Sequence, residues 1–187
     1  IVHTVGYPEA DLSHFRSTDI WMTAGDGTQV PGTGWAGRYL DNEFPEYGEA
    51  PTSYPLAVQL GGGAPLMFQG PASQMGMSVQ SMALFDRLAA TAELYSVEGL
   101  PSSRLGGEMA FLRSVANDSF FFAEAIQTAS DAGSNQAEYT TPNPLAEQLS
   151  AVARLIRGGL GSRIYHVSLG GFDTHAGQAN THATLLR

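Results

Sequence analysis

The sequence predicts an α/β fold in which a mainly parallel sheet is flanked by helices. Two apolar runs, Ile1–Tyr7 and Arg163–Leu169, are expected to be strands of one sheet, because each is followed by a loop and a helix. Ahead of the second run, a predicted helix ends at Gly158 and Gly159 and leads directly into it, which is half of a parallel α/β unit. The first run begins without a lead-in and the last predicted helix is cut short, so we expect a domain that continues at both ends.

Glycine and proline divide the first part of the chain into short elements. Ser13 is a good N-cap for a helix in "SHFRSTDIWMT", and "WAGRYLDNEF" predicts a second short helix or turn. The runs "PLAVQLGGG" and "PLMFQGP" are apolar and broken by Gly and Pro, which favours two short strands. These elements and those that follow are expected to form one α/β domain over residues 1–187.

The second part of the chain is predicted to be mostly helical before its final strand. A helical section spans about residues 81–130, and a polar linker covers about 131–143. Asn143 can cap the next helix and Pro144 suits its first position. That helix carries an apolar stripe at helical spacing, formed by Leu145, Leu149, Val152 and Ile156.

The composition excludes several kinds of chemistry. The chain has no cysteine and all nine basic residues are arginine, so thiolate catalysis, disulfides, a Schiff-base lysine and a P-loop lysine are absent. A net charge of -9 argues against nucleic acid or an anionic membrane as the main partner. No apolar run reaches the length of a transmembrane segment.

The stretch "SLGGFDTHAGQANTH" is a candidate metal site at the end of the last predicted strand. In open α/β sheets, ligands bind beyond the carboxyl ends of the strands, where Asp173 and His175 fall after a Gly-Gly pair. His182 lies seven residues after His175, which is the same face of a helix. A carboxylate with imidazoles suits zinc or a similar divalent ion. The alternative is that Asp173 caps the following helix and both histidines are surface residues.

A second candidate, "SHF", lies where the first helix begins. The N-terminus of a helix presents free N–H groups and partial positive charge, so Ser13 is a candidate nucleophile and His14 a candidate catalytic partner. Serine is also one of the best N-caps, and capping alone would explain Ser13. In "GWAGRYL", Arg38 offers a guanidinium fork for a tetrahedral anion, or a structural arginine stacked on Trp35 or Tyr39.

The segments "VGYPEADLSHFRSTDIW", "GWAGRYLD", "VARLIRGGLGSRIYHVSLGGFDTHAGQ" and "HATLLR" resemble the bacterial domain-of-unknown-function 1501 family. That family is similar in fold to the alkaline phosphatase and sulfatase superfamily. The resemblance touches both ends of the chain and is most specific in "SHFRSTDIW" and "GGFDTHAGQ", whereas about residues 45–139 carry little of it. It implies that this chain is an internal portion of a longer protein that carries a twin-arginine export signal and works in the periplasm or outside the cell.

The resemblance also implies a set of roles. Ser13 matches the hydroxyl nucleophile, and Asp173 with His175 matches one half of a divalent metal site, most simply for zinc. Because the superfamily spacing is wider than D-x-H, His182 competes with His175 as the second ligand. The remaining ligands would come from segments outside these residues.

Three functions follow from these observations. The first is an exported metal-dependent hydrolase of small-molecule or polymer-borne phosphate or sulfate esters, with Arg38 holding the anion. The second is a non-catalytic binding or assembly protein that keeps the fold and has a protein partner. The third is a fragment that does nothing alone.

Overall fold

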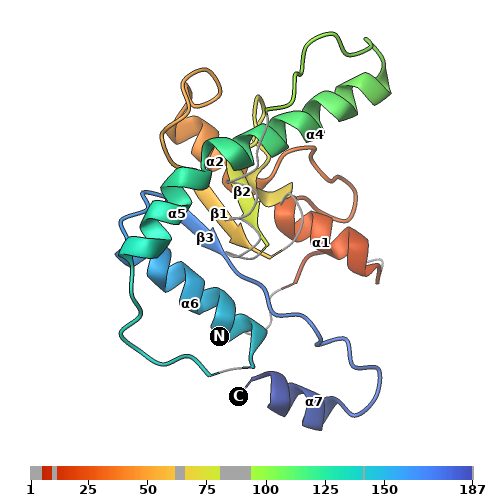
Figure 1. The fold of residues 1–187 in the computed structure, drawn as a ribbon. Helices are drawn as coiled ribbons and strands as arrows, with labels where there is room; N and C mark the ends of the chain where they lie inside the picture. The colour runs from red at the N-terminus through yellow and green to blue at the C-terminus, as the bar shows by residue number, and fades with distance from the viewer. Residues whose placement is uncertain (1–5, 10–11, 62–65, 81–93, 141, 187) are drawn as a thin grey trace.

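A small parallel sheet lies at the centre of the molecule, with helices around it (Figure 1). The computed structural model describes residues 6–9, 12–61, 66–80, 94–140 and 142–186. The elements in chain order are α1 (His14–Thr23), α2 (Trp35–Glu43), β1 (Ala57–Leu60), the 3-10 turn η1 (Leu66–Phe68), β2 (Gly76–Val79), α4 (Arg104–Phe121), α5 (Ala123–Ala132), α6 (Pro144–Arg157), β3 (Ile164–His166) and α7 (Gln178–Leu185). The prediction of an α/β fold with a parallel sheet flanked by helices is therefore confirmed.

The sheet has the strand order β2-β1-β3, with both pairs parallel. Ala57 pairs with Gly76 on one side and with Ile164 on the other, so β1 is the central strand. The polypeptide leaves β1 towards β2 and returns much later on the opposite side of β1. The carboxyl ends of the three strands consequently meet at one edge of the sheet.

The predicted strands are partly right. The run Arg163–Leu169 contains β3, and "PLAVQLGGG" contains β1. Most of Ile1–Tyr7 lies outside the described residues, and Gly6 and Tyr7 are not in a strand. The strand predicted in "PLMFQGP" is wrong: Leu66–Phe68 forms a 3-10 turn, and the N–H of Met75 returns to the carbonyl of Phe68 at 2.9 Å. The chain reverses here and then enters β2, a strand that was not predicted.

Helices are found at α1, α2 and α6 as predicted, whereas residues 94–103 of the predicted helical section are not helical. Ser13 caps α1 by accepting a hydrogen bond from the N–H of Arg16, and Asn143 caps α6 by accepting from Leu145 and Ala146. Residues 94–130 of the predicted helical section hold α4 and the greater part of α5, and residues 81–93 lie outside the described residues. Within the described residues, no helix is long and apolar enough to cross a membrane.

The core forms where α5, α6 and η1 pack on the sheet, and its largest fully buried side chains include Leu56, Val58, Phe68, Met75, Ile126 and Leu155. The stripe predicted for α6 is rotated relative to this core. Leu155 is fully buried, whereas Leu149 and Ile156 remain exposed. The position of α6 is decided by its close approach to α5 and not by its apolar stripe alone.

Two glycines allow α5 and α6 to touch through their backbones. A Cβ atom on Gly158 would lie 1.7 Å from the carbonyl oxygen of Ala129, and one on Gly133 would lie 1.9 Å from that of Arg154. Arg154 also donates from Nη2 to the carbonyl of Ser130 at 2.8 Å. The turn that leads into β3 is therefore held tightly against the end of α5.

Gly158→Ala is expected to destabilise the protein by about 1–3 kcal/mol, because the added methyl group forces the two backbones apart. Gly107→Ala is the matched control, because Gly107 lies in α4 and a Cβ atom added there would meet nothing within 4 Å. That change should stabilise the protein by about 0.5–1 kcal/mol through helix propensity. Urea unfolding of both variants measures the difference, and equal midpoints would contradict the close approach of α5 and α6.

Candidate functional site

The polypeptide continues past β3 beyond the carboxyl edge of the sheet and ends in α7, which lies apart from the other helices (Figure 1). Gln148 of α6 holds the start of this segment at Ser168, donating to its carbonyl at 2.9 Å and accepting from its N–H at 3.0 Å. Gly171 follows with a φ of +91°, a conformation that favours glycine. The turn brings Asp173 towards the start of α1.

Asp173 lies between two histidines that come from opposite ends of the chain. Its Oδ2 atom is 3.0 Å from Nε2 of His175 and 3.2 Å from Nε2 of His14. The side chains of His14, Asp173 and His175 are 77%, 54% and 83% exposed. We call these three residues the His-Asp-His cluster. The structure thus brings a candidate catalytic residue, His14, into contact with a candidate metal ligand.

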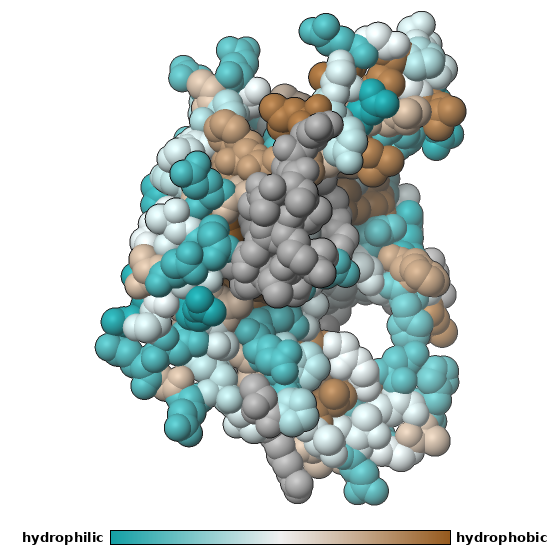
Figure 2. Space-filling view, viewed as in Figure 1, coloured by the Kyte–Doolittle hydropathy of each residue, from teal (hydrophilic) through white to brown (hydrophobic). Residues whose placement is uncertain are grey.

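The cluster is open to solvent. Figure 2 shows an opening through the molecule between α1 and the segment that leads to α7. His175 has a positive φ of 47°, which is uncommon for a residue with a side chain and fixes the turn of the backbone beside Asp173. The cluster joins the two ends of the described chain without burying them.

Ser13 lies directly before His14, at the N-terminus of α1. Its Oγ atom accepts a hydrogen bond from the N–H of Arg16 at 3.3 Å, so the hydroxyl caps the helix. Capping and a catalytic role are compatible, because a cap oxygen sits among the unpaired N–H groups of the first turn.

His182 does not share in the cluster. Its Nε2 atom donates to the carbonyl oxygen of Phe172 at 3.1 Å, and its ring packs edge-on against the Phe172 ring at 5.2 Å. His182 therefore ties α7 to the loop ahead of Asp173. Of the two histidines that competed as the partner of Asp173, the structure places His175 beside the carboxylate.

Arg38 is used to hold the fold together. Nη1 donates to the carbonyl of Thr33 at 2.7 Å and Nη2 donates to the carbonyl of Thr23 at 2.9 Å. Thr23 is the last residue of α1, about 14 Å along the helix axis from His14. The structure does not bring Arg38 to the His-Asp-His cluster, and its hydrogen bonds support the structural alternative, although through carbonyl groups and not through ring stacking.

A row of polar side chains that was not predicted crosses the sheet. Gln59 in β1 pairs in register with Ser78 in β2 and with His166 in β3, and these three side chains are half-buried. Nδ1 of His166 donates to Oε1 of Gln59 at 3.1 Å, and burial lowers the pKa of His166, which favours the neutral ring. Such a row cannot be found before the register of the strands is known.

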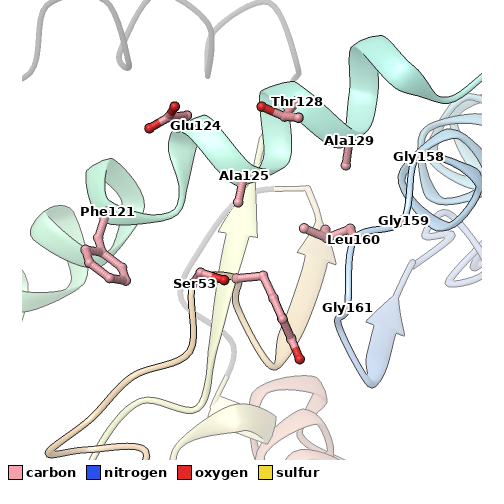
Figure 3. Close-up of a pocket in the computed structure, with 11 residues that line it drawn as sticks. Ser53, Phe121, Glu124, Ala125, Thr128, Ala129, Gly158, Gly159, Leu160 and Gly161 are labelled. Carbon is pink, nitrogen blue, oxygen red and sulfur yellow. The ribbon is translucent and has the colours of Figure 1, made fainter.

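A separate cavity of about 460 Å³ lies at the other end of the sheet, where the chain enters β1 and β3. Figure 3 shows Ala125 and Ala129 turned into it towards Leu160, whereas Glu124 and Thr128 stand on the other side of α5. The ring of Tyr54 fills the space that a side chain on Gly161 would need. Its lining combines the apolar Ala125, Ala129 and Leu160 with the polar residues Ser53, Glu124 and Thr128, and it does not include any residue of the His-Asp-His cluster.

The His-Asp-His cluster has the donor types that zinc takes: two imidazole nitrogens and a carboxylate. Both histidines contact the same carboxylate oxygen, Oδ2 of Asp173. Among the described residues, no group of three or more His, Cys, Asp or Glu side chains is arranged to enclose a metal ion. The donors fit a divalent ion in kind, and Asp173 with His175 would supply a pair of ligands rather than a complete shell.

The fold and the site define an α/β protein that carries an exposed His-Asp-His cluster beyond the carboxyl edge of a short parallel sheet. No protein-family model, curated protein or solved structure matches this chain.

Proposed function

We propose that the chain belongs to the domain-of-unknown-function 1501 family, has an alkaline phosphatase-like fold, and acts as a metal-dependent hydrolase of phosphate or sulfate esters. The observation that carries this proposal is the contact between His14 and Asp173. The motif that contains Ser13 and His14 and the motif that contains Asp173 and His175 lie near opposite ends of the sequence. They are in contact through His14 and Asp173. Export by the twin-arginine route and a periplasmic or secreted location belong to the same proposal.

The proposed ligands of the metal are Asp173 and His175, since their side chains already lie 3.0 Å apart. A divalent ion bound there would supply Lewis acidity towards the ester oxygen and the serine hydroxyl. His182 is left out because its Nε2 is bonded to Phe172. Arg38 is left out because its N–H groups donate at the far end of α1.

Ser13 is the proposed nucleophile. Its Oγ forms a bond to the phosphorus or sulfur atom as the hydroxyl proton passes to His14, the bond to the ester oxygen breaks, and the alcohol leaves with the proton that His14 returns. Water then releases phosphate or sulfate from Ser13. His14 is held at Nε2 by Asp173, so Nδ1 is the ring atom that can take or give the proton.

The N-terminus of α1 contributes electrostatically. The first turn of α1 contains no acidic residue of its own. The partial positive charge of the helix end favours the extra negative charge that develops on the transferred group.

A second function, binding or assembly without catalysis, is favoured by one observation. Leu12 and Phe15, the residues that flank Ser13 and His14, have side chains that are 90% and 87% exposed. Apolar side chains beside the cluster suit a surface that another protein covers. In this alternative the cluster is a structural contact.

The experiment that separates the two functions is hydrolysis of an aryl phosphate and an aryl sulfate with added zinc and with a chelator. We expect turnover by the longer natural chain that the resemblance implies, its loss on chelation and its return with zinc. The 187-residue chain alone should bind zinc weakly and lack activity, because two ligands make an incomplete shell. A longer chain that takes up no zinc and has no activity would favour the assembly function.

A further inference from the structure

A second cavity of about 460 Å³ lies against α1, and its walls are aromatic. The residues that line it are Gly6, Tyr7, Ile20, Trp21, Ala24, Gly25 and Trp35. The rings of Tyr7 and Trp21 meet at 81° with centroids 6.5 Å apart, so they form two perpendicular walls. Trp35, at the start of α2, supplies a third ring. We call this cavity the aromatic pocket.

The pocket is separate from the His-Asp-His cluster. Trp21 lies seven residues after His14 in α1, which is about 10 Å along the helix axis. Trp21 and Trp35 are each about half exposed, so neither is a core residue. Gly34 packs closely on η1, where an added Cβ would lie 2.1 Å from the carbonyl of Met67, and this contact fixes where α2 begins.

Few hydrogen-bonding groups are free in the walls. The hydroxyl of Tyr7 is already bonded to Ser17. The N–H of Gly25 is bonded to the carbonyl of Ile20 at 3.2 Å. The other polar side-chain atoms of the lining residues are the two indole N–H groups, which only donate. The side chains of the walls therefore offer a sugar ring few direct hydrogen-bond partners.

The charges of the chain favour a cation. The net charge is -9, and Asp26 directly follows the lining residue Gly25. Hydrogen bonds from Thr28 and Gln29 lower the pKa of Asp26, which keeps it ionised. Arg16 donates from Nη2 to the carbonyl of Gly27 at 3.2 Å, and its positive charge lowers the pKa of Asp26 further.

We propose that the aromatic pocket binds a quaternary ammonium group, as found in choline and related compounds. Such a group carries diffuse positive charge and no hydrogen-bond donor, so it needs ring faces and not polar partners. The perpendicular rings of Tyr7 and Trp21 offer aromatic faces, and the net charge of -9 favours a cationic ligand. This site is independent of the proposed hydrolase activity and does not require a metal.

The chain itself supplies the reporter for a test. It contains two tryptophans, and both line the pocket, so intrinsic fluorescence reports directly on occupancy. Choline is titrated against its neutral isostere 3,3-dimethyl-1-butanol, with sodium chloride matching the ionic strength. We expect saturable binding of choline that is at least about tenfold tighter than that of the isostere.

Variants of Tyr7 connect the signal to the pocket. Tyr7→Leu removes a wall and should weaken choline binding at least about threefold, whereas Tyr7→Phe keeps the ring and should retain binding. Tyr39→Leu is the control, because Tyr39 is an exposed aromatic residue of α2 that does not line the pocket. Vesicles of phosphatidylcholine against phosphatidylglycerol distinguish a lipid headgroup from a free cation as the source of the ammonium group.

Three results would overturn the proposal. Equal affinity for choline and the neutral isostere would show a simple apolar pocket. A fluorescence change with cellobiose but not with choline would show a sugar site. No change with choline at any concentration, in a protein with an unaltered circular dichroism spectrum, would show that the pocket does not recognise this group.

Discussion

Ser13→Ala is expected to lower kcat for ester hydrolysis by at least about 1000-fold, with zinc affinity unchanged, because the variant loses the attacking oxygen and keeps Asp173 and His175. The proposed nucleophile is not a proposed ligand, so binding and turnover should separate. Turnover of an aryl phosphate and calorimetric titration with zinc measure the two quantities on the same preparation of the longer chain.

The control for this prediction follows from the capping role of Ser13. Its Oγ accepts from the N–H of Arg16, so alanine also removes an N-cap worth about 0.5–2 kcal/mol. Ser13→Asp restores a capping oxygen without a hydroxyl. We expect this variant to recover stability against urea and to stay inactive. Activity in Ser13→Asp would show that Ser13 serves the helix and not the reaction.

Asp173→Ala is expected to weaken zinc binding at least about 100-fold and to lower the zinc content of the purified protein to background. The carboxylate is the shared centre of the His-Asp-His cluster, so its removal also frees both histidines from their common partner. Elemental analysis and zinc titration give the result. Unchanged zinc content in Asp173→Ala would contradict the proposed site.

The histidines provide a matched pair of variants. His175→Ala should weaken zinc binding, because His175 lies 3.0 Å from the carboxylate of Asp173. His182→Ala should leave zinc binding nearly unchanged, because the Nε2 of His182 bonds to the carbonyl of Phe172. A larger loss in His182→Ala than in His175→Ala would reverse the assignment of the second ligand.

Local signals predicted much of the fold. The caps Ser13 and Asn143 act through their nearest neighbours, so the sequence located the start of α1 and of α6 correctly. The segment around Leu66–Phe68 was predicted wrongly because its reversal depends on a bond from Met75 to Phe68, which no local apolar pattern reveals. The face that α6 buries depends on Gly133 and Gly158, and that contact joins two helices.

The residues of the candidate site were predicted from the chemistry of their side chains, but the contacts among them were not predicted. Asp173, His175 and His14 were singled out for their side chains and their place after a strand or before a helix. The contact between His14 and Asp173 joins the two ends of the chain, so it could be found only in three dimensions. His182 had suitable spacing from His175, yet a carbonyl within its own loop takes its ring nitrogen.

The order of the strands in the sheet also determines when each strand can pair during synthesis on the ribosome. The contact between Gln59 in β1 and His166 in β3 joins residues 107 positions apart. At about 5–20 residues per second, one edge of β1 waits roughly 5–20 seconds for its partner strand to be made. During that interval an apolar strand offers unpaired N–H and C=O groups to any neighbouring chain. This edge of β1 is therefore paired only after β3 has emerged from the ribosome.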